Sequence, residues 1–262
     1  MTRLSIVIPA YNEEKRIKKT LEEYYKFFES KKNEDFEFEI LIVINNTKDL
    51  TEKIVKDFSK NKSEIRYLNL KQGGKGFAIK EGFKDALKRN NDLIGFVDAD
   101  LATSPNAFYS LFQNIKSWEG IIANRRLKGS IVYPDQAIQR VLAGRIFNFI
   151  VRILFFFPYS DTQCGAKLFK REALKKIVPM LGMTRWAFDI EILYLFHKNG
   201  FRIKQIKTEW RDVADSKLRL GKVSMQMLFA SLRLRIVNSP FKKLLKPLKP
   251  LLDKLWNKLD KF

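Results

Sequence analysis

Short apolar runs alternate with longer amphipathic stretches through the first half of the chain. The runs have the length of β-strands, and the stretches between them repeat their apolar positions at helical spacing. This alternation predicts an α/β domain: a Rossmann-like, mostly parallel sheet with helices on both faces. The expected strands are residues 4–8, 38–44, 65–70, 93–97 and 120–123, and the expected helices are residues 13–30, 51–60, 75–89 and 105–117.

The second half is less regular, and its composition changes once, near residue 217. Before that point we expect helices over 136–156, from Arg171 and over 187–198, and strands over 164–169 and 202–207. We therefore divide the chain into a first domain, residues 1–217, and a basic tail of amphipathic helices, residues 218–262.

The tail combines leucine with lysine. From residue 239 its leucines recur at three- and four-residue steps with lysines between them, and we expect a regular helix from about Pro250. An apolar face with a basic rim is typical of helices that lie on an anionic membrane surface. A C-terminal helix packed on the core of the domain is the alternative.

Membrane contact is expected to be peripheral. The most apolar run, residues 146–158, is interrupted by Arg152 and is shorter than the roughly 20 residues that cross a bilayer. The first residues enter a strand pattern without a secretory signal. We therefore expect the protein at the cytoplasmic face of a membrane.

The charge is strongly positive, with 50 Lys and Arg against 29 Asp and Glu and a net charge of +21. Such a chain attracts nucleic acid, anionic lipid or phosphorylated substrates. No nucleic-acid motif is present and the basic residues gather in the tail, so a nucleic-acid-binding module is only a remote alternative. The single cysteine and the single histidine, Cys164 and His197, exclude an internal disulfide and argue against zinc chemistry.

Candidate chemistry is concentrated at the ends of three expected strands. Asp98 and Asp100 follow the strand 93–97 directly, and two carboxylates at a strand end suit a Mg²⁺ or Mn²⁺ ion that bridges the phosphates of a sugar nucleotide. Residues 9–14 and the glycine-rich residues 72–76 follow two other strands and each open a helix, which suits phosphate binding. Because ligands bind at the carboxyl ends of parallel strands, these segments are expected to form one site.

Six segments in this order resemble the dolichyl-phosphate β-glucosyltransferase branch of the inverting GT-A glycosyltransferases, over residues 4–217. They are SIVIPAYNEE (5–14), GKGFAIKEGF (74–83), DADLATSP (98–105), DTQCGAKLF (161–169), RWAFDIEILY (185–194) and SKL (216–218). The resemblance implies a GT-A fold and a metal-dependent enzyme that transfers glucose from UDP-glucose, with inversion, to a dolichyl or other polyprenyl phosphate.

The resemblance also implies roles for single residues. The nucleotide sugar would be bound by Pro9, Ala10, Tyr11, Glu13, Asn45, Lys75, Asp98, Ala99 and Asp100, of which Asp98 and Asp100 would hold the metal ion. The acceptor phosphate would meet Arg125, Arg140 and Arg145, and the catalytic groups would be Arg125, Asp161 as base, and the acidic pair Asp189 and Glu191.

Two points leave alternatives open. Where relatives read VDDGSTDGT after the second strand, residues 43–51 read VINNTKDLT, so the carboxylate that often contacts the uracil is replaced. A mannosyl, galactosyl or N-acetylglucosaminyl transferase on the same lipid, or a GT-A transferase acting on a saccharide, remains as an alternative. The Phe-rich helix 145–157 is expected either to receive the prenyl chain, with Phe149, Phe155 and Phe156 facing it, or to be a buried core helix.

Overall fold

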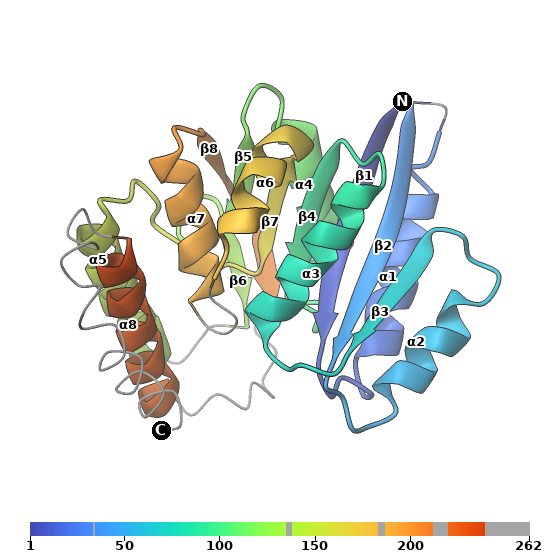
Figure 1. Ribbon diagram of the computed structural model, residues 1–262, viewed down its shortest axis with the longest axis horizontal. Coiled ribbons are helices and arrows are strands. Elements are labelled where there is room, and N and C mark those ends of the chain that lie inside the picture. Colours follow the sequence, from blue (N-terminus) through green and yellow to red (C-terminus); the bar gives the residue numbers. More distant parts are fainter. Residues whose placement is uncertain (34, 135–137, 183–186, 212–219, 239–262) are drawn as a thin grey trace.

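The computed structural model describes residues 1–33, 35–134, 138–182, 187–211 and 220–238. Within these ranges the chain forms a sheet with helices on both faces, confirming the α/β prediction (Figure 1). The strands are β1 (Thr2–Ala10), β2 (Phe36–Asn45), β3 (Ile65–Leu70), β4 (Leu93–Val97), β5 (Gly120–Asn124), β6 (Ile131–Tyr133), β7 (Ala166–Lys170), β8 (Ile203–Lys207) and β9 (Glu209–Arg211). The helices are α1 (Ile17–Glu29), α2 (Thr51–Ser59), α3 (Lys75–Lys88), α4 (Pro105–Asn114), α5 (Ile138–Phe155), α6 (Arg171–Ile177), the 3₁₀ turn η1 (Val178–Met180), α7 (Phe188–Lys198) and α8 (Leu220–Val237).

The main sheet has seven strands in the order β3-β2-β1-β4-β7-β5-β8. All neighbouring strands are parallel except β7, which runs antiparallel to both β4 and β5. Because of that reversal, the first residue of β7 lies at the same edge of the sheet as the last residues of β4 and β5. A second, two-stranded sheet pairs β6 with β9, and both of these strands were missed by the sequence pattern.

Alternate side chains of the strands point into two apolar cores, one on each face of the sheet. In β1, Val7 belongs to the core covered by α3, α6 and α7, whereas Ile6 and Ile8 belong to the core covered by α1, α2 and α4. Strands β2, β4 and β5 are buried on both faces almost throughout, which explains their nearly continuous apolar sequences.

The first helix begins at Ile17, four residues later than expected. Residues before it form a turn: Asn12 has a φ of 52°, and its backbone N–H donates to the Thr47 hydroxyl at 2.9 Å. The backbone N–H of Glu13 donates to the hydroxyl of Thr51 at 2.8 Å. Side chains from the loop after β2 therefore delay the helix, an effect that local periodicity does not register.

The start of the expected tail packs against the domain. Helix α8 contacts α5, and its Leu234 is buried in the same core as α7. Residues 239–262, with the leucine and lysine pattern, lie outside the described residues, so the division at residue 217 stays a prediction. None of the helices in the described ranges combines the length and the apolar character needed to cross a bilayer.

Candidate active site

The carboxyl edge of the main sheet gathers most of the predicted site residues. β1 leads into Tyr11 and Glu13, β4 into Asp98 and Asp100, and β5 into Arg125. Loop 158–165 returns to this edge because β7 starts there. Segments far apart in the sequence are thus brought together by strand direction.

Asp98 and Asp100 lie where the nucleotide sugar is expected, a part of this edge called the donor side below. An Asp98 carboxylate oxygen lies 2.5 Å from the Lys75 ammonium, and an Asp100 oxygen accepts from the backbone N–H of Ala102 at 3.0 Å. Burial, together with the negative charge of Asp98, raises the pKa of Asp100. Two crowded carboxylates of this kind are stabilised by a cation.

The donor set fits Mg²⁺ or Mn²⁺, which prefer carboxylate oxygens. Groups of three or more His, Cys, Asp or Glu side chains with metal-binding geometry do not occur within the described ranges. Asp98 and Asp100 would therefore supply two ligands, and the diphosphate of the donor and water would supply the others, as is usual for Mg²⁺ bound with phosphates.

Gly165 determines how closely loop 158–165 approaches the carboxylates. A Cβ atom built on Gly165 would collide with an Asp98 carboxylate oxygen. Glycine at this position therefore lets the backbone before β7 pass beside Asp98 without displacing its carboxylate. The residue lies inside the DTQCGAKLF segment, yet its role was missed because it depends on a partner 67 positions earlier in the sequence.

The loop after β1 is held by its neighbours. The Glu13 carboxylate forms two hydrogen bonds with Arg16, at 2.7 and 2.8 Å. Burial raises the pKa of Glu13 in spite of this arginine. Tyr11 is about half exposed, so its ring is open to a ligand, whereas Ala10 is buried and Pro9 is only partly exposed in β1.

Asn45 has both ends of its amide engaged within the protein. Its nitrogen donates to the carbonyl of Ala10 at 3.1 Å, and its oxygen accepts from the backbone N–H of Gly74 at 3.2 Å. It therefore ties the glycine-rich loop to the end of β1. Ala99 is also buried, and its carbonyl accepts from the Thr20 hydroxyl at 2.6 Å, so Asn45 and Ala99 support the site from within the protein.

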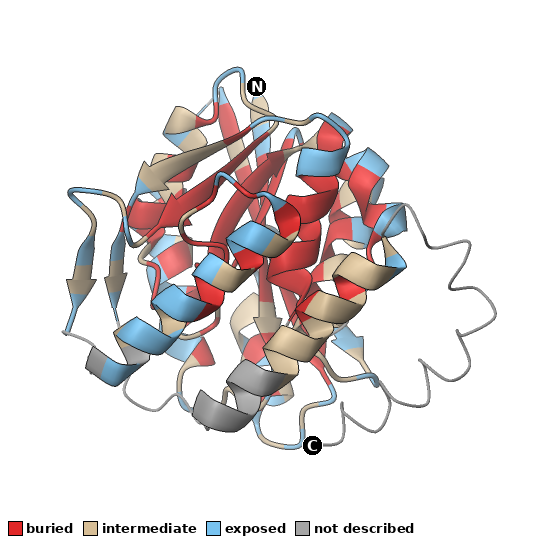
Figure 2. Ribbon diagram, turned by 90° about the vertical axis from the view of Figure 1, so that its left-hand side faces the viewer, coloured by how far each residue is buried: buried red, intermediate tan, exposed pale blue. Residues whose placement is uncertain are grey.

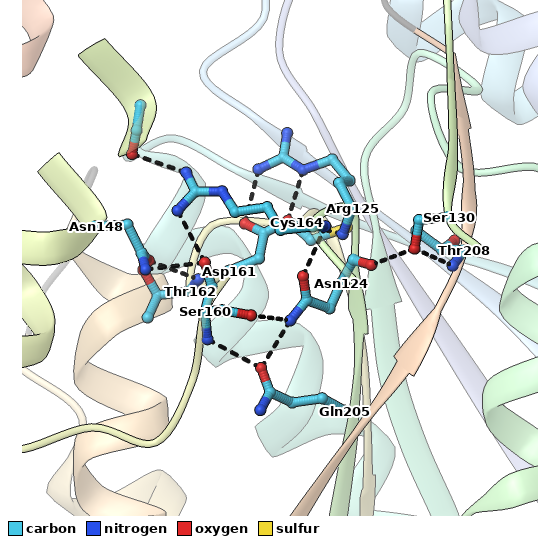
Figure 3. Close-up of polar contacts among 12 residues, drawn as sticks. Asn124, Arg125, Ser130, Asn148, Ser160, Asp161, Thr162, Cys164, Gln205 and Thr208 are labelled. Carbon is cyan, nitrogen blue, oxygen red and sulfur yellow. Dashed lines mark hydrogen bonds and ion pairs between the residues drawn. The ribbon is translucent and has the colours of Figure 1, made fainter. Parts of the chain in front are cut away.

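Arg125 and the buried Asp161 form an ion pair at the part of this edge where the acceptor phosphate is expected, called the acceptor side below (Figure 3). Two guanidinium nitrogens of Arg125 lie 2.7 and 2.8 Å from the carboxylate oxygens, and the backbone N–H of Arg125 donates at 3.1 Å. Burial alone would raise the pKa of Asp161, but Arg125 outweighs it and lowers that pKa to about 2. So acidic a carboxyl is a weak base, which favours a role in orienting Arg125. The central carbon of the Arg125 guanidinium lies 4.9 Å from the Trp210 ring centre.

Arg126 was missed by the sequence reasoning. Its guanidinium donates to the carbonyl of Ser160 at 2.8 Å and to the carbonyl of Gly144 in α5 at 2.7 Å. Burial is the main reason why its pKa is lowered, and Arg125 and Arg145 add to that effect. Arg126 thus links α5 to the loop that carries Asp161.

Helix α5 carries two of the arginines predicted to bind the acceptor phosphate and part of the Phe-rich segment. Arg145 is exposed beside Gly144, and Arg140 lies in α5, although its side chain is outside the described set. Phe149 and Phe156 are exposed, whereas Phe155 is buried against Phe157 and Tyr194. The expectation that Phe155 faces a lipid was wrong, because the helical phase turns it into the core.

Asp189 connects to the donor side through two lysines. One carboxylate oxygen lies 2.5 Å from the ammonium of the fully buried Lys167, and the other lies 4.0 Å from Lys75. Lys167 looked like an ordinary strand residue in the sequence. Glu191 accepts from the backbone N–H of Gly182 at 3.0 Å, which holds the chain ahead of α7.

The chain is similar in sequence to known glycosyltransferases. The model of the family described as glycosyl transferase family 2 matches residues 5–178. A dolichyl-phosphate beta-glucosyltransferase of Dictyostelium discoideum is 36% identical over 88% of this chain and 73% of its own length. Another from Trichomonas vaginalis is 34% identical over 83% of this chain, which spans 66% of that relative.

The fold resembles solved glycosyltransferase structures. Glucosyl-3-phosphoglycerate synthase of Mycobacterium tuberculosis, in complex with UDP, superposes with a TM-score of 0.67 and 17% identity, covering 91% of this chain and 82% of that one. The same enzyme in complex with Mn²⁺, UDP and phosphoglyceric acid gives a TM-score of 0.66 at 17% identity, over 89% and 78% of the two chains. The predicted GT-A fold is confirmed.

Proposed function

The chain belongs to glycosyl transferase family 2, and from that membership we propose that it transfers glucose from UDP-glucose, with inversion, to dolichyl or another polyprenyl phosphate. The names of the relatives support both the sugar and the acceptor. We also propose that it works peripherally at the cytoplasmic face of a membrane, since a polyprenyl acceptor resides in a bilayer.

One observation carries the proposal: the two kinds of phosphate site lie on neighbouring strand ends. Asp98 and Asp100 follow β4, and Lys75, the first residue of α3, pairs with Asp98. Arg125 follows β5, and its partner Asp161 lies in the loop before β7. Since Gly165 packs directly against Asp98, the loop that carries Asp161 borders the donor side. A diphosphate donor and a phosphate acceptor can therefore meet at one edge.

The residues act mainly through charge. A phosphate monoester is largely a dianion near neutral pH, since its second pKa is about 6, so the acceptor is nucleophilic without a strong base. Arg125 suits this phosphate because a guanidinium binds phosphate oxygens in pairs, and Asp161 holds it in position. Lys75, paired with Asp98 and 4.0 Å from Asp189, would offset negative charge on the leaving diphosphate.

The metal completes the donor site. Mg²⁺ or Mn²⁺ held by Asp98 and Asp100 would offset negative charge on the diphosphate as the bond to the sugar breaks. The metal-bound complexes of the M. tuberculosis enzyme support a divalent ion in this fold. The short contact between Lys75 and Asp98 indicates that a cation is favoured at this carboxylate.

A donor panel tests the function. The full chain is incubated with Mg²⁺, polyprenyl phosphate and radiolabelled UDP-glucose, GDP-mannose, UDP-galactose or UDP-N-acetylglucosamine, and label extracted into organic solvent is counted. We expect label from UDP-glucose. If another donor gives more label in the organic phase, the proposed sugar is wrong and that donor's sugar takes its place. Label found only in soluble saccharides would refute the lipid acceptor.

The metal role is tested by Asp100→Ala. We expect transfer to fall below about a thousandth of wild type, because the donor diphosphate loses its bridge to the protein. Asp92→Ala, at the amino end of the same strand β4, is the matched control and should retain activity. Full activity of Asp100→Ala with added Mg²⁺ would contradict the assignment, provided that circular dichroism shows an unchanged fold.

A further inference from the structure

Helix α5 exposes an apolar stripe that none of the described neighbouring segments covers. Four of its members recur within α5 at steps of four and three residues, which places them along one side of the helix. The fifth, Phe156, directly follows the last residue of α5, and each of the five is more than half exposed. They are Leu142, Ile146, Phe149, Ile153 and Phe156. Figure 2 looks onto the side of the molecule where α5 and α8 lie, and exposed segments follow the length of α5.

The stripe is a consequence of how α5 is anchored. The opposite side of the helix packs into the core through Phe147, Val151 and Phe155. That packing fixes the rotation of the helix, so the stripe must face outward. Single exposed apolar residues are ordinary on proteins, but a continuous row of five large ones marks a contact surface.

The charges near the stripe indicate what kind of partner binds this surface. Helices α5 and α8 contact each other and together carry basic residues and no acidic ones. The basic residues whose side chains the structure describes are Arg145, Arg152, Arg233 and Arg235. The Arg235 guanidinium lies 6.0 Å from the ring centre of Phe156, so charge and apolar surface adjoin. A surface that is both apolar and basic is complementary to the interface of an anionic lipid bilayer.

The stripe also lies close to the acceptor side of the active site. Gly144, between the first two members of the stripe, has its carbonyl bonded to Arg126, next to Arg125. A membrane seated on α5 would therefore present its phosphate headgroups near the arginine that the proposed reaction needs. No such position is required for a water-soluble acceptor.

We propose that the stripe on α5, with the basic residues of α5 and α8, is the surface by which this protein docks on an anionic membrane. The apolar side chains enter the boundary between headgroups and acyl chains, and the arginines contact lipid phosphates. The inference rests on the proposed function for the reason why a membrane is needed, but it concerns residues that do not touch the donor site.

The first test is sedimentation of the full chain with vesicles of phosphatidylcholine and phosphatidylserine, without substrates. Phe149→Ser combined with Ile153→Ser should weaken binding at least tenfold, because two large apolar side chains no longer leave water. The matched control, Tyr67→Ser combined with Met180→Ser, removes exposed apolar residues outside α5 and α8 and should bind as wild type. Unchanged binding of the α5 variant would overturn the proposal.

The second test uses the single cysteine. Cys164 is fully buried, so Phe149→Cys can be labelled selectively with an environment-sensitive fluorophore. On addition of the same vesicles its emission should shift to shorter wavelength and be quenched by lipids that carry a nitroxide in the acyl chain, whereas a label at Tyr67→Cys should not respond. Absence of quenching at position 149 would overturn the proposal.

A second copy of the chain is the rival occupant. If light scattering shows a dimer that the Phe149→Ser and Ile153→Ser variant converts to a monomer, the stripe is a subunit interface and the proposal fails. Failure of the docking proposal can be told apart from failure of the proposed reaction. Vesicle binding without transfer of any sugar would contradict the proposed reaction alone. Binding of UDP-glucose, measured by calorimetry, should be equal for wild type and the α5 variant.

Discussion

Replacing Asp161 by asparagine tests the ion pair that positions Arg125. Asp161 is almost completely buried and accepts three hydrogen bonds from Arg125. The fall of its pKa from the ordinary 3.8 to about 2, at 1.36 kcal/mol for each pH unit, corresponds to about 2.5 kcal/mol of stability at neutral pH. Removing one partner of a buried pair costs about 3–5 kcal/mol in general, because the other charge is left without a partner. We therefore expect Asp161→Asn to lower the free energy of unfolding by about 2.5–5 kcal/mol.

The pH dependence of this stability loss shows whether it comes from the charge of Asp161. The pKa of Asp161 is lowered by folding, so its contribution is present above about pH 4 and is lost as the pH falls toward 2. With the two pKa values above, roughly 1 kcal/mol of the contribution is lost by pH 3. The difference in the free energy of unfolding between wild type and Asp161→Asn should therefore be smaller at pH 3 than at pH 7 by roughly 1 kcal/mol.

The assay is urea unfolding followed by circular dichroism at both pH values. Asp57→Asn is the matched control, because Asp57 pairs with Lys60 on the exposed surface, and no measurable change is expected. A loss below 1 kcal/mol for Asp161→Asn at pH 7, or an equal loss at pH 7 and pH 3, would refute the assignment of a strong buried pair.

Three further predictions concern the region around β7. Gly165→Ala should lower transfer at least tenfold, measured with UDP-glucose, because a Cβ there displaces the Asp98 carboxylate; wild-type activity would show that the loop yields without effect. Lys167→Met should destabilise the fold by about 3 kcal/mol in urea titration, since Asp189 loses its buried counter-ion, and a neutral result would mean that Lys75 suffices. Burial raises the pKa of Cys164 to about 11, so its thiol should react with Ellman's reagent only after unfolding, and fast reaction of the native protein would contradict this.

The sequence predicted the elements well where one periodicity held over a whole element. The strand before Asp98 and Asp100 was expected at 93–97 and lies there, because a strand buried on both faces has a nearly uninterrupted apolar sequence. The split between Phe149 and Phe155 could not be read from a run of phenylalanines, because it depends on which side of the helix meets the core.

The site was predictable in its location and less so in its pairings. Strand ends placed Asp98 and Arg125 at one edge, but the partner of Arg125 lies 36 residues away on an irregular loop. Lys167 stands in an apolar strand, where a lysine usually signals a solvent-facing position. Its burial depends on Asp189 of α7, a pairing that no local pattern encodes.

The reversed strand β7 has a consequence for synthesis of the protein. β4 is complete at residue 97, but its neighbour on one side is completed only at residue 170. At about 5–20 residues per second, a ribosome needs roughly 4–15 s to make the chain between them. During that interval the edge of β4 has unpaired backbone groups, which invite pairing with other nascent chains. Slow translation of residues 98–170 should therefore increase aggregation of this protein more than a similar delay after β8.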